Sequence, residues 1–274
     1  MLYLKSYCYS QHELPFIIAN LDEGFNYIDK YYLYEYNARH TGRHKDYEIA
    51  KVLHLIPEHL REKLVYKMVD VESYMEDCYE NEQRIHDMVE PIQRSWFYND
   101  EDVKLEDEDI IIDIDCDEII YRDSYSKMLE ELNKKNYPLG IRLNQFFYKQ
   151  NYIWINCNFS SPTIYKYQMV KNSGKVIKGL KIMNLRDIGD KTDKIYGCHC
   201  SWIMPASYMV NKLHSYSHPC YRKYADEKVL QKAIDDKVYI FDLNRKFDIV
   251  ELPINHQLIP KSLQKEELFD YLTE

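Results

Sequence analysis

Three aspartates follow a run of isoleucines in the stretch DIIIDIDCDEII, which spans Asp109 to Ile120. Side chains at alternate positions of a β-strand share one face, so Asp113, Asp115 and Asp117 would converge if the strand continued through all of them. Carboxylates this close repel one another, which raises the pKa of one of them or calls for a cation between them. The spacing therefore predicts a cation site or an acid with altered proton affinity.

We expect the strand to end near Ile114 and to release Asp115, Asp117 and Glu118 into a loop, because its isoleucine run is typical of a strand buried on both faces. Oxygen ligands without a nearby set of His and Cys favour Mg²⁺ or Mn²⁺, which binds one or two carboxylates and takes water and substrate phosphates as its other ligands. A D-x-D at the end of a strand thus indicates a bridge from the protein to a diphosphate. The alternative is a solvated acidic loop.

The composition excludes several classes of protein. The 274 residues include 36 Lys and Arg against 45 Asp and Glu, a net charge of −9, so a broad cationic surface for nucleic acid or anionic membrane is not expected. The chain has no secretory pattern at its start and no apolar run of about 18 residues. Its 7 cysteines, an odd and scattered set, favour reduced thiols. We therefore expect a soluble, cytoplasmic protein that binds any phosphate at a local site.

The elements of the first half predict a parallel sheet. Residues 2–9 and 30–37 have strand patterns, and residues 12–28 between them have the pattern of an amphipathic helix opened by Pro15. Strand, helix and strand at this spacing indicate a βαβ unit. The strand at residues 108–115 would extend the same sheet, and in such sheets ligands bind beyond the carboxyl ends of the strands.

The remaining elements predict a more mixed arrangement. They are a helix-rich segment at residues 57–93, a helix at 125–135, tyrosine-rich strands at 141–167, a polar stretch at 171–194, a strand at 195–204 and helices at 207–216 and 226–234. No repeat or linker marks a boundary, so we predict one domain over residues 1–274. The predicted fold class is α/β, with a mainly parallel central sheet flanked by helices and a mixed second half.

Several stretches resemble, in order along the chain, glycosyltransferase family 17, which includes the enzymes that add bisecting N-acetylglucosamine to N-glycan cores. The similar stretches are SQHELPFIIANLDEGFNYIDKYYLYEYN, NEQR, DIIIDIDCDEI, YGCHCSWIM, NKLHSYSH and DEKVLQKAI, between Ser10 and Asp242. The D-x-D-E is moderately specific and the G-x-H-C-S-W pattern is more so. The resemblance implies a GT-A fold, a UDP-sugar donor (UDP-GlcNAc in known members), a carbohydrate acceptor, Mn²⁺ or Mg²⁺, and inversion at the anomeric carbon.

The resemblance implies roles for the acids of the first half. Asp115 and Asp117 correspond to the pair that binds metal and diphosphate, with Glu118 beside them. Glu13 and Glu35 follow the first and second strands, where the ribose and base of the nucleotide would lie. Glu13 would equally suit the dipole at the start of a helix.

The resemblance also implies cationic contacts to the donor. Arg84 offers a planar fork to phosphate, although a surface pair with Glu80 would explain it as well. Lys212 and His218 would neutralise the departing UDP, and a solvated helix lysine explains the first equally well.

His199 lies between Cys198 and Cys200, which invites a zinc interpretation, but no second Cys/His pair stands at a suitable spacing for four ligands. In a strand, His199 would point away from its two cysteines. We predict that it makes a third contact to the metal or diphosphate, and a satisfied core histidine is the alternative.

Inverting transfer needs a carboxylate that removes the proton of the acceptor hydroxyl while the metal stabilises the leaving diphosphate. Asp226 and Glu227, which open a late helix, match acids of the family pattern and are our candidates for this base. Glu118 is a weaker candidate, because it would lie too close to the metal. Acids at a helix N-terminus also have a purely structural explanation.

The chain departs from the family pattern at two positions: Ile120 stands where proline commonly follows D-E-I, and Cys198 stands where Trp precedes His. Donor or acceptor preference is therefore expected to differ. Animal members carry an amino-terminal membrane anchor, which we do not find in this sequence. The 27 tyrosines would suit stacking on sugars. An AT-rich genome is the simpler explanation and is typical of a bacterium or a large DNA virus, of which we favour the virus.

Two other functions are consistent with the sequence. One is a catalytically silent module that binds a sugar or nucleotide on the same fold, although the retained acids and His199 argue against it. The other is a metal-dependent nucleotidyltransferase, which would release pyrophosphate, but no glycine-rich phosphate loop is present. The acceptor and the oligomeric state are not indicated by the sequence.

Overall fold

The computed structural model describes residues 1–186, 188–242 and 244–265. Within these residues ten strands form one sheet, in the order β12-β7-β6-β8-β4-β1-β2-β3, with β11 beside β6 and β5 beside β11. The strands of the first half are β1 (Leu2–Cys8), β2 (Lys30–Tyr36), β3 (Leu64–Val69), β4 (Ile110–Asp113) and β5 (Glu118–Ile120). The second half adds β6 (Leu139–Phe147), β7 (Tyr152–Phe159), β8 (Thr163–Lys166), β11 (Asp190–Ser201) and β12 (Ile249–Glu251). A separate hairpin pairs β9 (Lys175–Ile177) with β10 (Leu180–Ile182).

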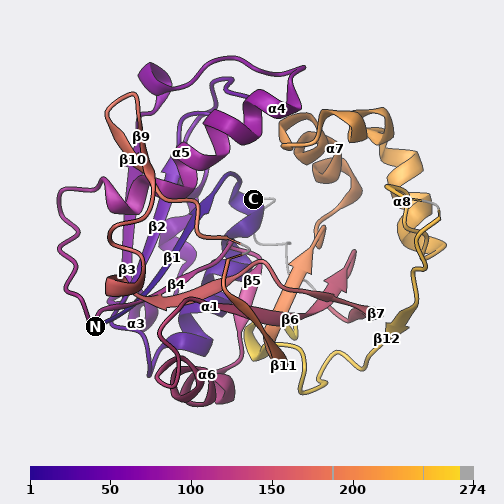
Figure 1. The fold of residues 1–274 in the computed structure, drawn as a ribbon. Helices are drawn as coiled ribbons and strands as arrows, with labels where there is room; N and C mark the ends of the chain where they lie inside the picture. The colour runs from indigo at the N-terminus through magenta and orange to yellow at the C-terminus, as the bar shows by residue number, and fades with distance from the viewer. Residues whose placement is uncertain (187, 243, 266–274) are drawn as a thin grey trace.

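The helices lie around the sheet (Figure 1). The α-helices are α1 (Leu14–Gly24), α2 (Ile49–Val52), α3 (Glu58–Arg61), α4 (Glu82–Arg84), α5 (Glu90–Ser95), α6 (Tyr125–Leu132), α7 (Ala206–Ser215) and α8 (Glu227–Asp235). A π-helical segment, Ile85–Val89, joins α4 to α5. Short 3₁₀ segments include Gln11–Glu13 before α1 and Pro219–Tyr224 between α7 and α8. No helix among the described residues is long and apolar enough to cross a membrane.

The first half confirms the predicted βαβ unit. Strand β1 pairs in parallel with β2 and β4, and β2 pairs in parallel with β3. Alternate residues of β1 enter two different cores, with Leu2 and Leu4 packing against α1 and Tyr3 and Tyr7 packing on the opposite face beside Phe97. Burial of both faces explains why these strands lack a polar side, as expected for a covered parallel sheet.

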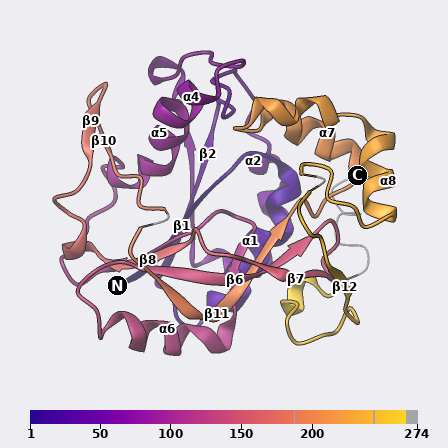
Figure 2. The same ribbon diagram turned by 45° about the vertical axis from the view of Figure 1, so that its right-hand side comes forward.

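The sheet is mixed beyond β4, so the prediction of a mainly parallel sheet holds for the first half. Strand β8 pairs antiparallel with both β4 and β6, while β7 is antiparallel to β6 and β12. The parallel pairing of β6 with β11 is the exception in this half. Figure 2 shows β6, β7 and β11 running beneath α7 and α8.

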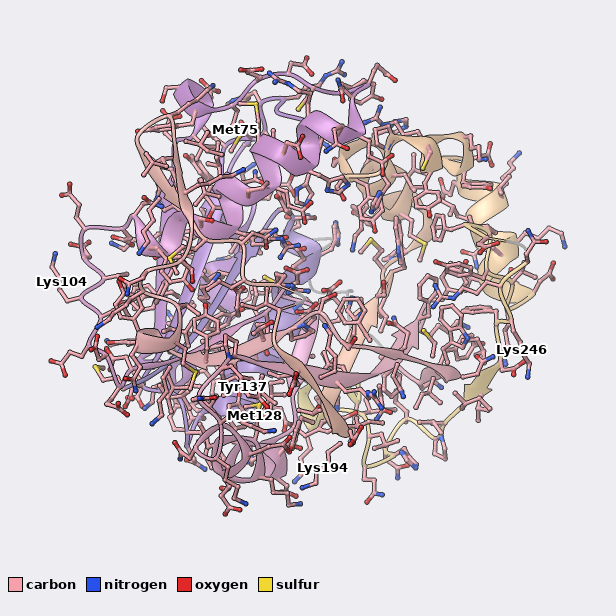
Figure 3. The ribbon with its side chains drawn as sticks, in the orientation of Figure 1. Met75, Lys104, Met128, Tyr137, Lys194 and Lys246 are labelled. Atoms are coloured by element: carbon pink, nitrogen blue, oxygen red, sulfur yellow. The ribbon has the colours of Figure 1, made fainter. Side chains whose placement is uncertain are left out.

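Three predicted segments differ in detail. The helix-rich segment at residues 57–93 contains strand β3, and the polar stretch at 171–194 contains the β9–β10 hairpin and the start of β11. The strand at 108–115 ends at Asp113, close to the predicted end. The exposed side chains of Lys104, Lys194 and Lys246 lie at separate points around the periphery (Figure 3).

Candidate active site

The three aspartates do not converge, because the strand ends before the last two. Asp113 closes β4 and forms a buried ion pair with Lys5, whose Nζ lies 2.7 Å from its Oδ2. Asp115 and Asp117 lie in the turn between β4 and β5, and both line a cavity of about 1090 Å³. The carboxylates of Asp115 and Asp117 are therefore available to a ligand in the cavity, while Asp113 holds β4 in place through its ion pair with Lys5.

Asp115 is held by two guanidinium groups. Arg94 Nη1 lies 2.7 Å from Asp115 Oδ1, and Arg186 Nη1 lies 3.4 Å from the same oxygen. Burial raises the pKa of Asp115, but Arg186 and Arg94 outweigh that effect and hold the pKa well below its usual range. Asp115 is therefore held as a carboxylate near neutral pH.

Arg186 is fixed from the other side by Glu118. The two side chains are buried and make a bidentate pair, with Nη1 to Oε2 at 2.7 Å and Nη2 to Oε1 at 2.5 Å. The backbone N–H of Asp115 also donates to Glu118 Oε2 at 2.6 Å. Glu118 therefore shapes the turn that presents the two aspartates, and its oxygens face into the protein.

Asp117 faces His199, which lies on β11 beside Gln145 of β6. Gln145 donates through Nε2 to the carbonyl of Phe146 at 2.9 Å, which directs its Oε1 toward His199 Nδ1 at 3.0 Å. Because a carbonyl oxygen can only accept, Nδ1 carries the proton of the neutral imidazole and Nε2 carries the lone pair. That Nε2 lies 3.6 Å from Asp117 Oδ1. Two electron-pair donors thus face each other across a gap that suits a cation.

The strand geometry around His199 is as predicted. Cys198 and Cys200 are buried in the core on the opposite face of β11, while His199 lines the cavity. The ring of Phe159 packs against the imidazole with 3.9 Å between centroids. Burial lowers the pKa of His199, although Asp117 and Asp115 oppose that effect, so the neutral form is favoured. Gly197 permits this pairing, because an added Cβ would lie 2.0 Å from the carbonyl oxygen of Ile119 on β5.

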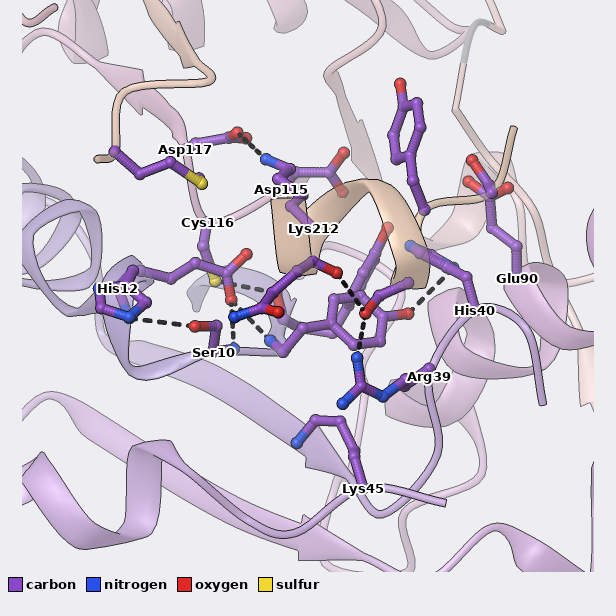
Figure 4. A pocket seen from close by; sticks show the side chains of 18 of the residues that line it. Ser10, His12, Arg39, His40, Lys45, Glu90, Asp115, Cys116, Asp117 and Lys212 are labelled. Atoms are coloured by element: carbon purple, nitrogen blue, oxygen red, sulfur yellow. Dashed lines mark hydrogen bonds and ion pairs between the residues drawn. The ribbon is translucent and has the colours of Figure 1, made fainter. Parts of the chain in front are cut away.

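Lys212 of α7 reaches toward Asp117, as Figure 4 shows, with Nζ 3.7 Å from Oδ2. The same ammonium lies 5.1 Å from the centre of the Trp202 ring. Both residues line the cavity. A cation is therefore placed beside the aspartates by a helix of the second half of the chain.

Glu13 lies on the wall of the same cavity and completes a capping box. Its Oε2 accepts from the backbone N–H of Tyr9 at 2.6 Å and of Ser10 at 3.2 Å, while the Ser10 hydroxyl accepts from the N–H of His12. Burial raises the pKa of Glu13 to about 7, with Lys212 opposing and Asp117 adding to the effect. Glu13 can therefore exchange a proton near neutral pH.

The cavity is rich in cationic and imidazole side chains, although the whole chain is acidic. Besides those already described, its described lining includes the cationic or imidazole residues Arg39, His40, His44, Lys45, Lys51, His86 and His218. Figure 4 shows Arg39, His40 and Lys45 around the cavity, together with the two aspartates. A volume of this size holds a small-molecule ligand, and the lining supplies the local group of cations that an acidic chain needs to bind phosphate.

The structure places Glu35 elsewhere, which corrects the prediction that it contacts the ribose or base. Glu35 is fully buried. Its oxygens accept from the backbone N–H groups of Glu48, Ile49 and Ala50, from Lys45 Nζ at 3.0 Å and from the Tyr66 hydroxyl at 2.5 Å. This carboxylate connects β2, β3 and α2, and a nucleotide cannot reach it.

The structure also revises the predicted roles of four further residues. Glu118 is enclosed by Arg186 and cannot reach an acceptor hydroxyl. Arg84 is exposed on α4 and pairs with Glu76, outside the described cavity lining. Asp226 caps α8 by accepting from the N–H of Val229, and Glu227 follows it on the exposed side of that helix. Neither of these last two acids is among the described residues that line the cavity.

Sequence reasoning missed Arg94, Arg186, Gln145 and Glu90. Arg94 and Glu90 are four residues apart on one helix, a spacing that indicates an ordinary surface pair. Arg186 follows the β9–β10 hairpin, and Gln145 lies within a strand rich in apolar residues. The contacts that bring Arg94, Arg186 and Gln145 into the site join segments distant in sequence, so no local spacing reveals them.

Comparison with known protein families identifies a family that matches the chain. The model of Glycosyltransferase family 17 matches residues 7–274, which is nearly the whole chain. Comparison with curated proteins gives no match.

Proposed function

Because the chain belongs to glycosyltransferase family 17, we propose that it is a metal-dependent, inverting transferase of the GT-A type. It would move a sugar, which we expect to be GlcNAc, from a UDP-sugar to a hydroxyl of a glycan or other acceptor. Membership of the family supports the transfer of a sugar between a donor and an acceptor. The cavity, the aspartates and the cations support the finer proposal.

The facing pair of Asp117 and His199 is the observation that carries the metal dependence. Its donors are a carboxylate oxygen and an imidazole lone pair 3.6 Å apart, with the tautomer fixed by Gln145. A histidine that donates its other N–H to a carbonyl is the usual arrangement of a metal-ligating imidazole. Mixed oxygen and nitrogen ligands suit Mn²⁺ better than Mg²⁺, which prefers oxygen alone. Asp115, whose negative charge is balanced by Arg94 and Arg186, would supply a second carboxylate ligand.

When bound, a cation there would offset the charge that grows on the diphosphate oxygen as its bond to the anomeric carbon breaks and the acceptor oxygen bonds to that carbon. Lys212 lies beside Asp117 and would contact the same phosphates through its ammonium. Arg94 and Arg186 keep Asp115 ionised and in place. His218 lines the cavity, but it is bonded to Glu82, and we do not assign it to the donor.

We propose Glu13 as the general base in place of Asp226 and Glu227. It lines the cavity, and its pKa of about 7 suits a group that takes a proton near neutral pH. Glu90 also lines the cavity, but it is less suited: burial raises its pKa, yet Arg94 and His86 more than offset this and hold the pKa well below its usual range. In Glu13→Gln, loss of a base would lower kcat about 100-fold or more with little change in KM. A rise in KM with kcat retained would instead assign Glu13 to nucleotide binding.

UDP release from a panel of UDP-sugars with Mn²⁺, with and without glycan acceptors, tests the proposed function. We expect turnover that falls at least about 100-fold in Asp117→Asn, since metal stabilisation of a leaving group is worth several kcal/mol. Asp226→Asn is the matched control, because it makes the same chemical change outside the cavity and asparagine also caps a helix. Binding of UDP-sugar without turnover would identify a silent module, and release of pyrophosphate from a nucleoside triphosphate would identify a nucleotidyltransferase.

A further inference from the structure

Three metal-ligating side chains meet at one part of the cavity rim, away from the pair of Asp117 and His199. They are Glu82 of α4, His86 of the π-helical segment and His218, the residue before the 3₁₀ segment Pro219–Tyr224. One ligand atom of each lies within 4.8 Å of the other two. His86 and His218 also line the cavity. More than 130 residues separate His218 from the other two, so the fold brings the group together.

Two of the three side chains are now joined by a hydrogen bond: the Glu82 carboxylate can only accept, so His218 Nδ1 carries a proton that a bound metal ion would replace. Glu82 Oε1 lies 2.5 Å from His218 Nδ1 and 3.8 Å from His86 Nε2, and the two imidazole centres are 5.1 Å apart. Ligand atoms about 2.0 to 2.1 Å from a tetrahedral Zn²⁺ lie roughly 3.4 Å from one another. The side chains are between 36% and 41% exposed, so small rotations can make up the difference.

The surroundings of His86 fix the nitrogen that it offers. Its Nδ1 lies 2.9 Å from Glu90 Oε2, and Glu90 is in turn bound by Arg94 at 2.8 Å. Since the Glu90 carboxylate can only accept, Nδ1 carries a proton, and in the neutral imidazole the Nε2 lone pair is directed toward Glu82. A carboxylate behind the imidazole is the arrangement that orients histidines in zinc sites.

We propose that Glu82, His86 and His218 bind a Zn²⁺ ion whose fourth position opens toward the cavity. Two histidines and one glutamate are a known three-ligand set for zinc, with water or a substrate group as the fourth ligand. The two imidazoles distinguish this site from the oxygen-rich aspartate site and favour Zn²⁺ over Mn²⁺. The proposal does not depend on the proposed function.

The ion would join two parts of the chain across the rim. In both ribbon views, α4 lies beside the segment around α7 (Figures 1 and 2). Neighbouring contacts cross at the same place, with Arg39 donating to the Ser215 hydroxyl and Arg222 Nη1 lying 3.4 Å from Glu80 Oε1. Zinc would therefore fix the position of this rim relative to the cavity and would offer an electrophilic position to an anionic ligand.

Isothermal titration of the metal-stripped full chain with Zn²⁺ tests the site. We expect one Zn²⁺ per chain at this site, and an affinity at least about 100-fold weaker in His86→Ala and in His218→Ala, because even partners behind the ligands contribute 10- to 100-fold. His214→Ala is the matched control, since this exposed histidine lies four residues before His218. Circular dichroism of each variant checks that it is folded, and the d–d absorption of Co²⁺ in the wild-type chain gives an independent readout of tetrahedral coordination.

Asp117→Asn separates this inference from the proposed function. We expect it to keep the Zn²⁺ affinity while losing the effect of Mn²⁺ on UDP binding, and His218→Ala to do the reverse. Zn²⁺ binding that survives both histidine substitutions, or that disappears in Asp117→Asn alone, would overturn the proposed site. A wild-type chain that binds no Zn²⁺ and gives no tetrahedral Co²⁺ spectrum would overturn it as well.

Discussion

Among single residues, Glu13 has a structural role and is also the general base that we propose. Its carboxylate closes the capping box before α1, yet it lies in the cavity wall and has a pKa of about 7. A capping box accepts glutamine as well as glutamate at this position. Glu13→Gln therefore removes the titration and retains the hydrogen bonds.

We predict that Glu13 makes the stability of the protein fall as pH rises from about 4.5 to about 7. The folded state holds the proton more tightly than the unfolded state, whose ordinary pKa is 4.5. Between the two pKa values the proton is bound mainly in the folded state, so the free energy of unfolding falls as pH rises, and it no longer changes for this reason above about 7. The contribution amounts to about 3 kcal/mol at most. Urea unfolding of wild type and Glu13→Gln at pH 5 and pH 8 measures it, and an identical pH dependence of the two proteins would contradict the assignment.

We predict that Gln145 raises the Mn²⁺ affinity of the proposed metal site without contacting the metal. Gln145→Leu removes the acceptor for His199 Nδ1 and frees the imidazole to change tautomer, so Mn²⁺ affinity should fall about 10- to 100-fold. The measurement is a titration with Mn²⁺ followed by electron paramagnetic resonance. Gln168→Leu makes the same change at an exposed position and should leave the affinity unaltered. Equal Mn²⁺ affinities of wild type and Gln145→Leu would show that Gln145 does not fix the tautomer of His199.

These residues also show how far the sequence predicts the site. The D-x-D was recognisable from its local pattern, and the family resemblance added His199 and Lys212; the structure brings all of them to one cavity. Arg94 and Arg186 were not, because their partner Asp115 is 21 and 71 residues away along the chain. Asp226 and Glu227 matched a pattern, but their positions on α8 are explained by capping and exposure.

At the scale of elements, Glu35 shows why a strand-end acid need not belong to a ligand site. It lies at the carboxyl end of β2, where the sheet places ligands, but the segment before α2 folds over it with Lys45, and Glu48 and the first two residues of α2 supply three backbone donors. Strand β3 adds the hydroxyl of Tyr66. These hydrogen bonds occupy the Glu35 oxygens in place of a ligand, and they depend on tertiary contacts that the sequence does not reveal.

We predict that Glu35→Ala destabilises the fold by about 3 to 5 kcal/mol, since it leaves a buried lysine and several donors without their acceptor. Urea unfolding gives the change, and Glu108→Ala serves as the control because Glu108 is 70% exposed. UDP affinity of the folded variant should match that of wild type. Normal stability with a lost affinity for UDP would restore the original nucleotide-binding role.

The predicted elements were most accurate where burial leaves a clear pattern. Strands β1 and β2 alternate between two cores, and the isoleucines of β4 are buried or nearly so. Strand β3 was missed because most of its residues are only partly buried at the sheet edge and the flanking residues favour helix. The β9–β10 hairpin has only three residues in each strand and lies in a polar stretch, and the sequence pattern does not indicate the positive φ angles of its turn at Lys178 and Gly179.

At the scale of the whole molecule, the site is assembled from both halves of the chain. The aspartates and Glu13 come from the first half, whereas His199 and Lys212 come from the second. The rim adds a contact of the same kind, in which the ring of Tyr79 lies between the guanidinium groups of Arg43 at 3.6 Å and Arg222 at 3.4 Å.

We predict that this stack stabilises the packing of the two halves of the chain against each other. Tyr79→Ala should cost about 1 to 2 kcal/mol, because each cation–π contact at a partly exposed site contributes roughly 0.5 to 1 kcal/mol. A double-mutant cycle with Arg222→Ala isolates the contact across the halves and should give a coupling energy of about 0.5 to 1 kcal/mol. Strict additivity of the two substitutions would show that the stack does not link the halves.

We propose that a divalent cation held by Asp117 and His199 binds the phosphates of a uridine nucleotide. Calorimetric titration of UDP in Mn²⁺ and in chelator measures this most directly, in wild type, Asp117→Asn and the control Asp226→Asn. We predict that Mn²⁺ strengthens UDP binding at least about tenfold in wild type and in the control, a difference of about 1.4 kcal/mol, and has no effect in Asp117→Asn. Equal UDP affinities with Mn²⁺, with Mg²⁺ and with chelator in the wild-type protein would contradict the claim.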